Sequence, residues 1–151
     1  MSLALNEAKK AYALDEVPVG SIIVKDGEVI SSSFNQVIAQ NSVAAHAEIN
    51  VIVAASKKLN NYRLTGCELY VTIEPCTMCV GAMVHARIKR VIFGALEPRA
   101  GALKSQLQLM EHGPYNHSIV WDGGVLAEQC GAMMADFFRQ KRDLKNKQTA
   151  K

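Results

Sequence analysis

Apolar residues recur at the three- and four-residue spacing of a helix in several parts of the chain. Near the N-terminus this spacing includes Leu5 and Ala8, and it ends before Pro18, which cannot easily continue a helix. Residues 44–59 carry the pattern of a second, buried helix. A third is expected from Pro75 to residue 86. The pattern therefore predicts three helices in the first two thirds of the chain.

A last helix is predicted after the Gly123-Gly124 turn. Its apolar residues Leu126, Cys130, Met133 and Phe137 form a stripe at spacings of four, three and four. Such a stripe is typical of the face that a helix packs against a core. We therefore interpret these four side chains as core residues and not as part of a cofactor site.

Five shorter segments favour β-strands. Asp26-Gly27, between the first two, predicts a hairpin turn because glycine accepts positive φ. The third and fourth segments flank the helix that begins at Pro75, and a strand-helix-strand unit usually pairs its strands in parallel. The expected strands are residues 19–24, 28–34, 69–73, 90–93 and 118–121. Together the elements predict an α/β fold with helices on both faces of one sheet.

Length and composition are those of an ordinary globular domain. The chain has 151 residues, of which 49% are hydrophobic and 21% charged, and its net charge is +3. No apolar run approaches the roughly 20 residues of a membrane span, and the first residues lack the basic and apolar regions of a secretion signal. We expect a single cytoplasmic domain over residues 1–151, with no membrane partner.

Positive charge gathers at the C-terminal end, over residues 139–151. The basic residues there are Arg139, Lys141, Arg142, Lys145, Lys147 and Lys151, opposed only by Asp143. Such a tail suits contact with the phosphates of a nucleic acid. A solvated helix end explains the same residues, because the helix dipole favours cations at that end.

Cys76 and Cys79 are the closely spaced pair among four cysteines. In a protein without a secretion signal this spacing indicates metal or redox chemistry before a disulfide. In the first turn of a helix both sulfur atoms can reach one point, and thiolates hold zinc at about 2.3 Å. A redox C-x-x-C is the alternative, but the chain lacks a thioredoxin-like arrangement around it.

His46 and Glu48 lie near the start of the second predicted helix. His46 could complete a Cys₂His set, which leaves a fourth zinc position open for water, as catalytic zinc requires. Glu48 projects in another direction, which suits a general acid/base, although a glutamate in a first turn also stabilises its helix. A structural site would instead have a fourth protein ligand. The candidates for it are Cys67, Cys130, His85, His112 and His117.

The motifs His46-Ala47-Glu48 and Pro75-Cys76-Thr77-Met78-Cys79 occur in the order of the H-x-E…P-C-x-x-C signature of zinc deaminases. Nearly the whole sequence resembles the bacterial tRNA-specific adenosine deaminases of the cytidine deaminase superfamily. Val51, where a small residue is expected, and residues 111–116 depart from the family pattern. The matching stretches are residues 15–20, 46–49, 61–64, 69–76, 81–83, 91–95 and 136–139.

The resemblance implies a cytidine deaminase-like, three-layer α/β/α fold around a five-stranded mixed sheet, and a homodimer. It implies one Zn²⁺ per chain, held by His46, Cys76 and Cys79, with Glu48 as the catalytic proton carrier. The implied reaction is hydrolytic deamination of the wobble adenosine to inosine in a tRNA anticodon loop by a zinc-activated water, with an arginine tRNA as the expected substrate. Two alternatives are a deaminase of free nucleobases or nucleotides and a non-catalytic zinc module that binds RNA.

Four further residues fall where the family contacts its substrate. Asn35 matches an asparagine placed against the target nucleoside, and Glu97 matches an acidic residue, often Asp, near the RNA sugars. Phe138 and Arg139 belong to the matching end of the last helix. Because Phe138 lies off the stripe that contains Phe137, its ring either faces RNA or widens the core face.

Overall fold

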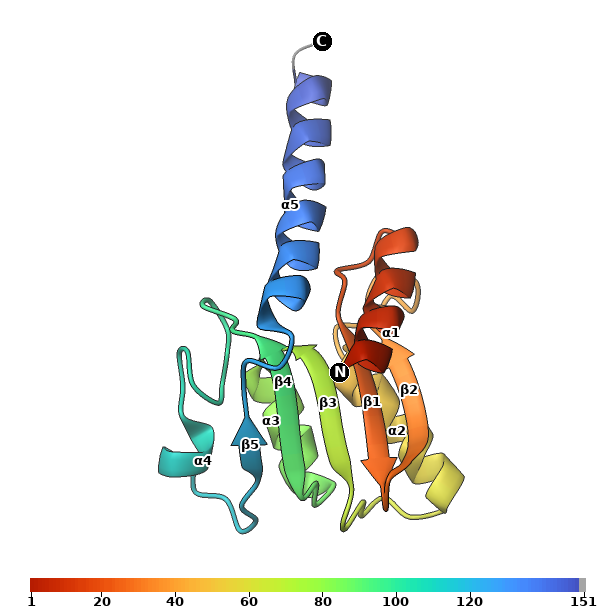
Figure 1. Ribbon diagram of the computed structural model, residues 1–151, viewed down its shortest axis with the longest axis vertical. Coiled ribbons are helices and arrows are strands. Elements are labelled where there is room, and N and C mark those ends of the chain that lie inside the picture. The colour runs from red at the N-terminus through yellow and green to blue at the C-terminus, as the bar shows by residue number, and fades with distance from the viewer. Residues whose placement is uncertain (150–151) are drawn as a thin grey trace.

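A five-stranded mixed sheet forms the middle layer of the protein in the computed structural model, which describes residues 1–149 (Figure 1). The elements, in chain order, are α1 (Ser2–Ala13), β1 (Gly20–Lys25), β2 (Glu28–Phe34), α2 (Ala47–Leu59), β3 (Glu68–Ile73), α3 (Thr77–His85), β4 (Arg90–Ala95), α4 (Leu109–His112), β5 (Val120–Asp122) and α5 (Ala127–Thr149). The short helix α4 was not expected from the sequence.

The strands lie in the order β2-β1-β3-β4-β5. β1 is antiparallel to both β2 and β3, whereas β3, β4 and β5 are parallel. The predicted hairpin turn is confirmed, since Asp26 and Gly27 both have positive φ, of 51° and 79°. The parallel pairing across α3 is confirmed as well, and with it the mixed α/β sheet.

Helices cover both faces of the sheet, as the sequence predicted. α2 and α3 lie on one face, and α1 and α5 lie on the other (Figure 1). Between the layers lies one apolar core, which includes the fully buried side chains of Val51, Val71, Met83 and Phe93. Burial of this apolar surface is the main contribution to the stability of the fold. None of the helices in the described part of the chain combines the length and the apolar character that crossing a membrane would need.

α2 and α3 begin two to three residues later than predicted. His46 and Cys76 have extended backbones, with ψ of 151° and 174°, so each is the N-cap of its helix and not part of it. α2 and α3 also contact each other. The two N-caps are therefore held on neighbouring helices, one from each half of the candidate motif.

The apolar face of α5 differs from the predicted stripe. Cys130 and Phe137 are buried, but Met133 is only half-buried and Leu126 is exposed, so the prediction was wrong at those two positions. Leu126 precedes the helix and has a left-handed φ of 53°, which takes it out of the helical repeat. Met134 packs against the core instead, so the buried face follows Cys130, Met134 and Phe137 at spacings of four and three.

Candidate active site and metal centre

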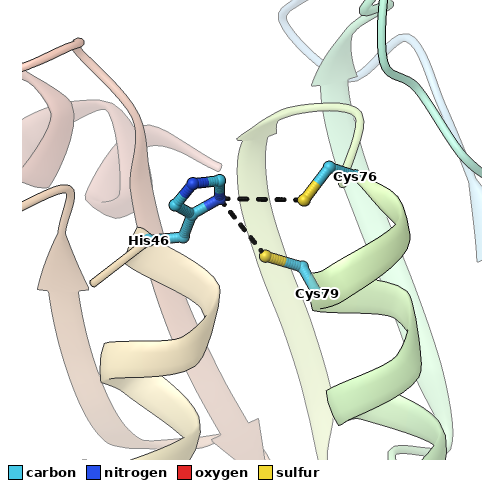
Figure 2. A group of neighbouring side chains, drawn as sticks. All are labelled: His46, Cys76 and Cys79. Carbon is cyan, nitrogen blue, oxygen red and sulfur yellow. Dashed lines mark hydrogen bonds between the residues drawn. The ribbon is translucent and has the colours of Figure 1, made fainter. Parts of the chain in front are cut away.

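The N-terminal ends of α2 and α3 bring together the three predicted metal ligands (Figure 2). Nδ1 of His46 lies 3.7 Å from Sγ of Cys76 and 3.5 Å from Sγ of Cys79. The three atoms all lie within 4.8 Å of one another. In a tetrahedral zinc site, bond lengths near 2.3 Å to sulfur and 2.0 Å to nitrogen place those ligand atoms about 3.6 Å apart. The donor set and its spacing therefore fit a zinc ion.

The local structure explains why these atoms converge. The backbone N–H of Ala47 donates a hydrogen bond of 2.7 Å to Oδ1 of Asn35, which ties the start of α2 to the end of β2. Cys76 is the N-cap of α3, and Cys79 lies in the first turn of the same helix. The positive end of a helix dipole favours thiolates, which are the form of cysteine that binds a metal.

The pKa values of the Cys76 and Cys79 thiols shift in opposite directions. The hydrogen bond between the two sulfurs is the main cause that lowers the pKa of Cys76 to about 4, and His46 acts in the same direction. The same hydrogen bond, with burial, raises the pKa of Cys79. A hydrogen bond to Cys76 raises the pKa of His46 in turn. A bound divalent cation would favour the thiolate form of both cysteines, so this arrangement suits a metal centre.

The candidate fourth ligands lie elsewhere in the described residues 1–149. Cys67 is buried just before β3, and Cys130 is buried against Gly94. Neither of them joins the group formed by His46, Cys76 and Cys79, and the three remaining histidines, His85, His112 and His117, do not join it either. The group thus offers three protein ligands, which is the number found in catalytic zinc sites.

Glu48 lies in the first turn of α2 and is 4% exposed. It is not a member of the ligand group. Burial is the main cause that raises the pKa of Glu48 to about 7, and the negative charge of Cys76 adds to it, whereas His46 opposes it. A carboxyl group with a pKa near neutrality can both take and return a proton, which is what a general acid/base requires.

A cavity of about 560 Å³ lies in front of these groups. His46, Glu48 and Cys76 form part of its wall, and the predicted substrate contacts Asn35, Glu97 and Phe138 line it as well. This volume is within the usual range of small-molecule sites. Six of the eight predicted site residues therefore line one cavity. Cys79 belongs to the ligand group without lining the cavity, and Arg139 does not line it either.

The packing of α5 shows where the Phe138 side chain lies relative to the core and the cavity. Its side chain is 43% exposed, and its ring meets the buried Phe137 ring edge-on at 5.4 Å. Phe138 therefore borders the cavity and does not widen the core. Arg139 is exposed, forms an ion pair with Asp136 and does not line the cavity.

Two buried carboxylates at this cavity had no specific signal in the sequence. Glu16 and Glu74 both line it and are both 2% exposed. Oε1 of Glu16 accepts a hydrogen bond of 2.7 Å from the backbone N–H of Ala39. Both glutamates lie in stretches that carry the family resemblance, but no spacing or motif identified them as site residues, because their partners come from loops distant in the sequence.

The basic end of α5 extends beyond the body of the protein (Figure 1). Lys145 and Lys147 are exposed, whereas Lys151 lies outside the described residues. Closer to the body, Lys141 forms an ion pair with Asp15 of the loop after α1 and lies 5.4 Å from the centre of the Phe137 ring. The helix thus carries positive charge from the edge of the cavity outwards.

Comparison with known proteins agrees with this fold and site. Residues 1–95 match the family model of the cytidine and deoxycytidylate deaminase zinc-binding region. With the three-ligand cluster and the α/β/α layers, this match defines the protein as a zinc-dependent deaminase. The chain is 43% identical to the tRNA-specific adenosine deaminase of Haemophilus influenzae, over 96% of this chain and 84% of that protein. It is also 43% identical to the tRNA-specific adenosine deaminase of Bacillus subtilis, over 96% and 90% of the two chains.

A solved structure from studies of A-to-I editing by tRNA:A34 deaminases at the wobble position of transfer RNA is similar over the whole fold. It superposes with a TM-score of 0.86 at 42% identity, and the match covers 88% of this chain and 96% of the other. The chain belongs to the family of tRNA-specific adenosine deaminases.

Proposed function

We propose that this chain hydrolyses the wobble adenosine of a tRNA anticodon loop, with an arginine tRNA as the expected substrate, to inosine and ammonia. The observation that carries the proposal is the single cavity in which Glu48 and the ligand cluster meet Asn35, Glu97 and Phe138. The relatives that are similar over nearly the full length of the chain are tRNA-specific adenosine deaminases, which supports the same substrate.

His46, Cys76 and Cys79 would hold one zinc ion, which lowers the pKa of a water from about 15.7 towards 7 and so provides a nucleophile at neutral pH. Glu48 would take one proton from the attacking water and deliver it to N1 of adenine. It would then take the second proton, from the hydroxyl group newly bonded to C6, and pass it to the amino group, which leaves as ammonia. The buried position of Glu48 next to Cys76 and His46 supports a role for this one carboxyl group in each transfer.

The remaining cavity residues would orient the nucleoside. Because Oδ1 of Asn35 accepts the N–H of Ala47, its amide NH₂ is the group that would donate to the base or ribose. Glu97 would accept a hydrogen bond from a ribose hydroxyl, and the exposed ring of Phe138 offers a stacking surface to a base. Such contacts require a base splayed out of its stack, which costs least in a single-stranded loop.

The test compares three substrates at matched concentration: an anticodon stem-loop, the same stem-loop with a scrambled loop, and free adenosine. We expect the stem-loop to be deaminated far faster than the other two, because only it adds sugar, phosphate and flanking-base contacts that orient the reacting atom. Nucleoside analysis for inosine measures the rates.

Equal rates on all three substrates would contradict tRNA editing and favour a deaminase of free nucleobases or nucleotides. Zinc binding without turnover of any of them would favour a non-catalytic RNA-binding module. A panel of tRNAs in place of the single stem-loop then tests the expected arginine tRNA.

Removal of the tail after Arg142 should weaken stem-loop binding and reduce its dependence on salt, with little effect on zinc content. The physical reason is the loss of Lys145, Lys147 and Lys151, since each phosphate contact contributes somewhat under one unit to the slope of log K against log salt. The matched control is the Lys9→Ala/Lys58→Ala variant, which removes exposed lysines from other parts of the surface. An unchanged slope in the truncated protein would mean that the tail is only a solvated helix end.

The proposal also includes a homodimer, which the family resemblance implies, and a cytoplasmic location, which the sequence features predict. Exposed apolar side chains on α2, on α3 and in the loop before α2 agree with a dimer, since Val53, Met78 and Val43 are 45%, 39% and 83% exposed. Exposed apolar side chains of this kind are available for another protein to cover.

A further inference from the structure

Glu74 follows the last residue of β3 and precedes Pro75 and the ligand Cys76. Its carboxylate is buried and accepts five hydrogen bonds. Oε1 accepts the backbone N–H groups of Leu103, Lys104 and Ser105, at 3.3, 2.7 and 2.8 Å. Oε2 accepts the backbone N–H of Glu97, at 3.1 Å, and the hydroxyl of Ser105. Every one of these donors comes from the segment 97–105, which follows β4.

The segment 97–105 wraps closely around this carboxylate. A Cβ added at Gly101 would lie 2.3 Å from Cδ and from Oε2 of Glu74, so only glycine lets the backbone approach so closely. The N–H of Ala102 also donates a hydrogen bond of 2.9 Å to the carbonyl of Pro75. The loop is thus fixed to the same short stretch of chain that carries Cys76.

The same segment forms one wall of the cavity. Glu97 and Ala100 line it together with His46, Glu48 and Cys76. Glu97 Oε1 accepts the N–H of Arg99, so the side chain is tied to its own loop and moves with it. Without Glu74, this loop would have four backbone N–H groups with no acceptor, and such groups are costly inside a protein.

We propose that Glu74 is a positioning residue of the active site: its buried carboxylate fixes the 97–105 loop, and through that loop holds Glu97 at the cavity wall. Charged hydrogen bonds are stronger than neutral ones, and five of them converge on this one group. Although Glu74 also lines the cavity, both of its carboxylate oxygens accept hydrogen bonds from the 97–105 loop, so its effect is expected on binding and not on proton transfer.

The first experiment follows hydrogen exchange of the zinc-loaded protein and needs no substrate. Glu74→Gln keeps the size of the side chain but replaces one acceptor oxygen with an NH₂ group, which repels the N–H donors. We expect amides of residues 97–105 to exchange about tenfold faster or more, while the strands of the sheet keep their protection. The control is Glu7→Gln, because Glu7 is also a buried glutamate but pairs with Lys10 on α1. Unchanged exchange in the loop would overturn the proposal.

The second experiment measures kcat and KM on the anticodon stem-loop, and so rests on the proposed function. For Glu74→Gln we expect KM to rise about tenfold and kcat to change little, because uniform binding is lost. In a double-mutant cycle with Glu97→Ala, the two effects on KM should be less than additive, since both act through Glu97. A fall in kcat with unchanged KM, or fully additive effects, would contradict the positioning role.

A milder variant covers the case in which Glu74→Gln does not fold. Ser105→Ala removes only the hydroxyl bond to Oε2 and leaves the backbone donors in place. It should give smaller increases in the amide exchange of residues 97–105 and in KM. A wild-type exchange rate in this loop would overturn the proposal. If exchange rises as expected but no variant, nor the wild type, edits the stem-loop, then the loop role stands and the proposed substrate fails.

Discussion

Glu48→Gln is expected to lose nearly all turnover while it keeps its fold and its zinc. General acid/base groups contribute typically 100- to 10,000-fold to a rate, and Glu48 is proposed to serve every proton transfer of the reaction. The substitution keeps the size of the buried side chain, and Glu48 is not a member of the ligand group, so the metal centre has no reason to change. Single-turnover rates on the stem-loop, with zinc analysis of the same sample, measure both effects.

The control for this prediction is again Glu7→Gln, which removes a carboxylate on α1 that does not line the cavity and should edit at the wild-type rate. Zinc lost together with activity would mean that Glu48 acts as a ligand. A zinc-replete variant with near-normal rates would contradict its proposed role as proton carrier.

Cys79→Ser is expected to lose the zinc and, with it, the activity. A serine hydroxyl does not ionise at neutral pH and is a far poorer zinc ligand than a thiolate. The position is buried in the first turn of α3, at 3.5 Å from Nδ1 of His46, so the substitution removes one of the three candidate ligand atoms. Metal analysis of the purified protein and the editing rate on the stem-loop both test the prediction.

Cys67→Ser and Cys130→Ser are the matched controls, because both remove a buried thiol outside the ligand group. Both variants should keep one zinc per chain and edit RNA, even if burial of the new hydroxyl lowers their stability by about 1–3 kcal/mol. Loss of zinc in either of them would replace the open, three-ligand site with a closed structural one.

The sequence by itself determined much of the fold. Asp26-Gly27 specifies its hairpin because two residues with positive φ are needed there and the local chemistry provides them. The strands β1, β3 and β4 are apolar because they are largely buried in the sheet, so local composition is enough to predict them. The candidate ligands His46, Cys76 and Cys79 could be predicted for a similar reason, because metal chemistry restricts the residue types and helix starts restrict their spacing.

Other features depend on contacts that no local pattern records. α2 and α3 begin only after His46 and Cys76, because these two residues have extended backbones that the apolar pattern alone does not reveal. The predicted stripe on α5 was wrong at Leu126 and Met133, since the helix begins only at Ala127 and the sheet decides which side of it is covered. In the same way, Phe138 borders the cavity because Phe137 occupies the core position beside it.

Glu74 illustrates most directly why some features of the site cannot be predicted from the sequence. In the sequence it is a glutamate after a strand, and its hydrogen-bond donors lie 23 to 31 residues further along. Local propensity acts between residues that are neighbours in the sequence, and metal binding restricts which residue types can be ligands. Both can therefore be recognised from the sequence alone. The burial of this carboxylate under the 97–105 loop arises only when β3 and β4 pair in parallel and bring the two chain segments to the same edge of the sheet. The sequence thus determined most of the elements and the candidate ligands, whereas the tertiary structure decided which loops form the walls of the site.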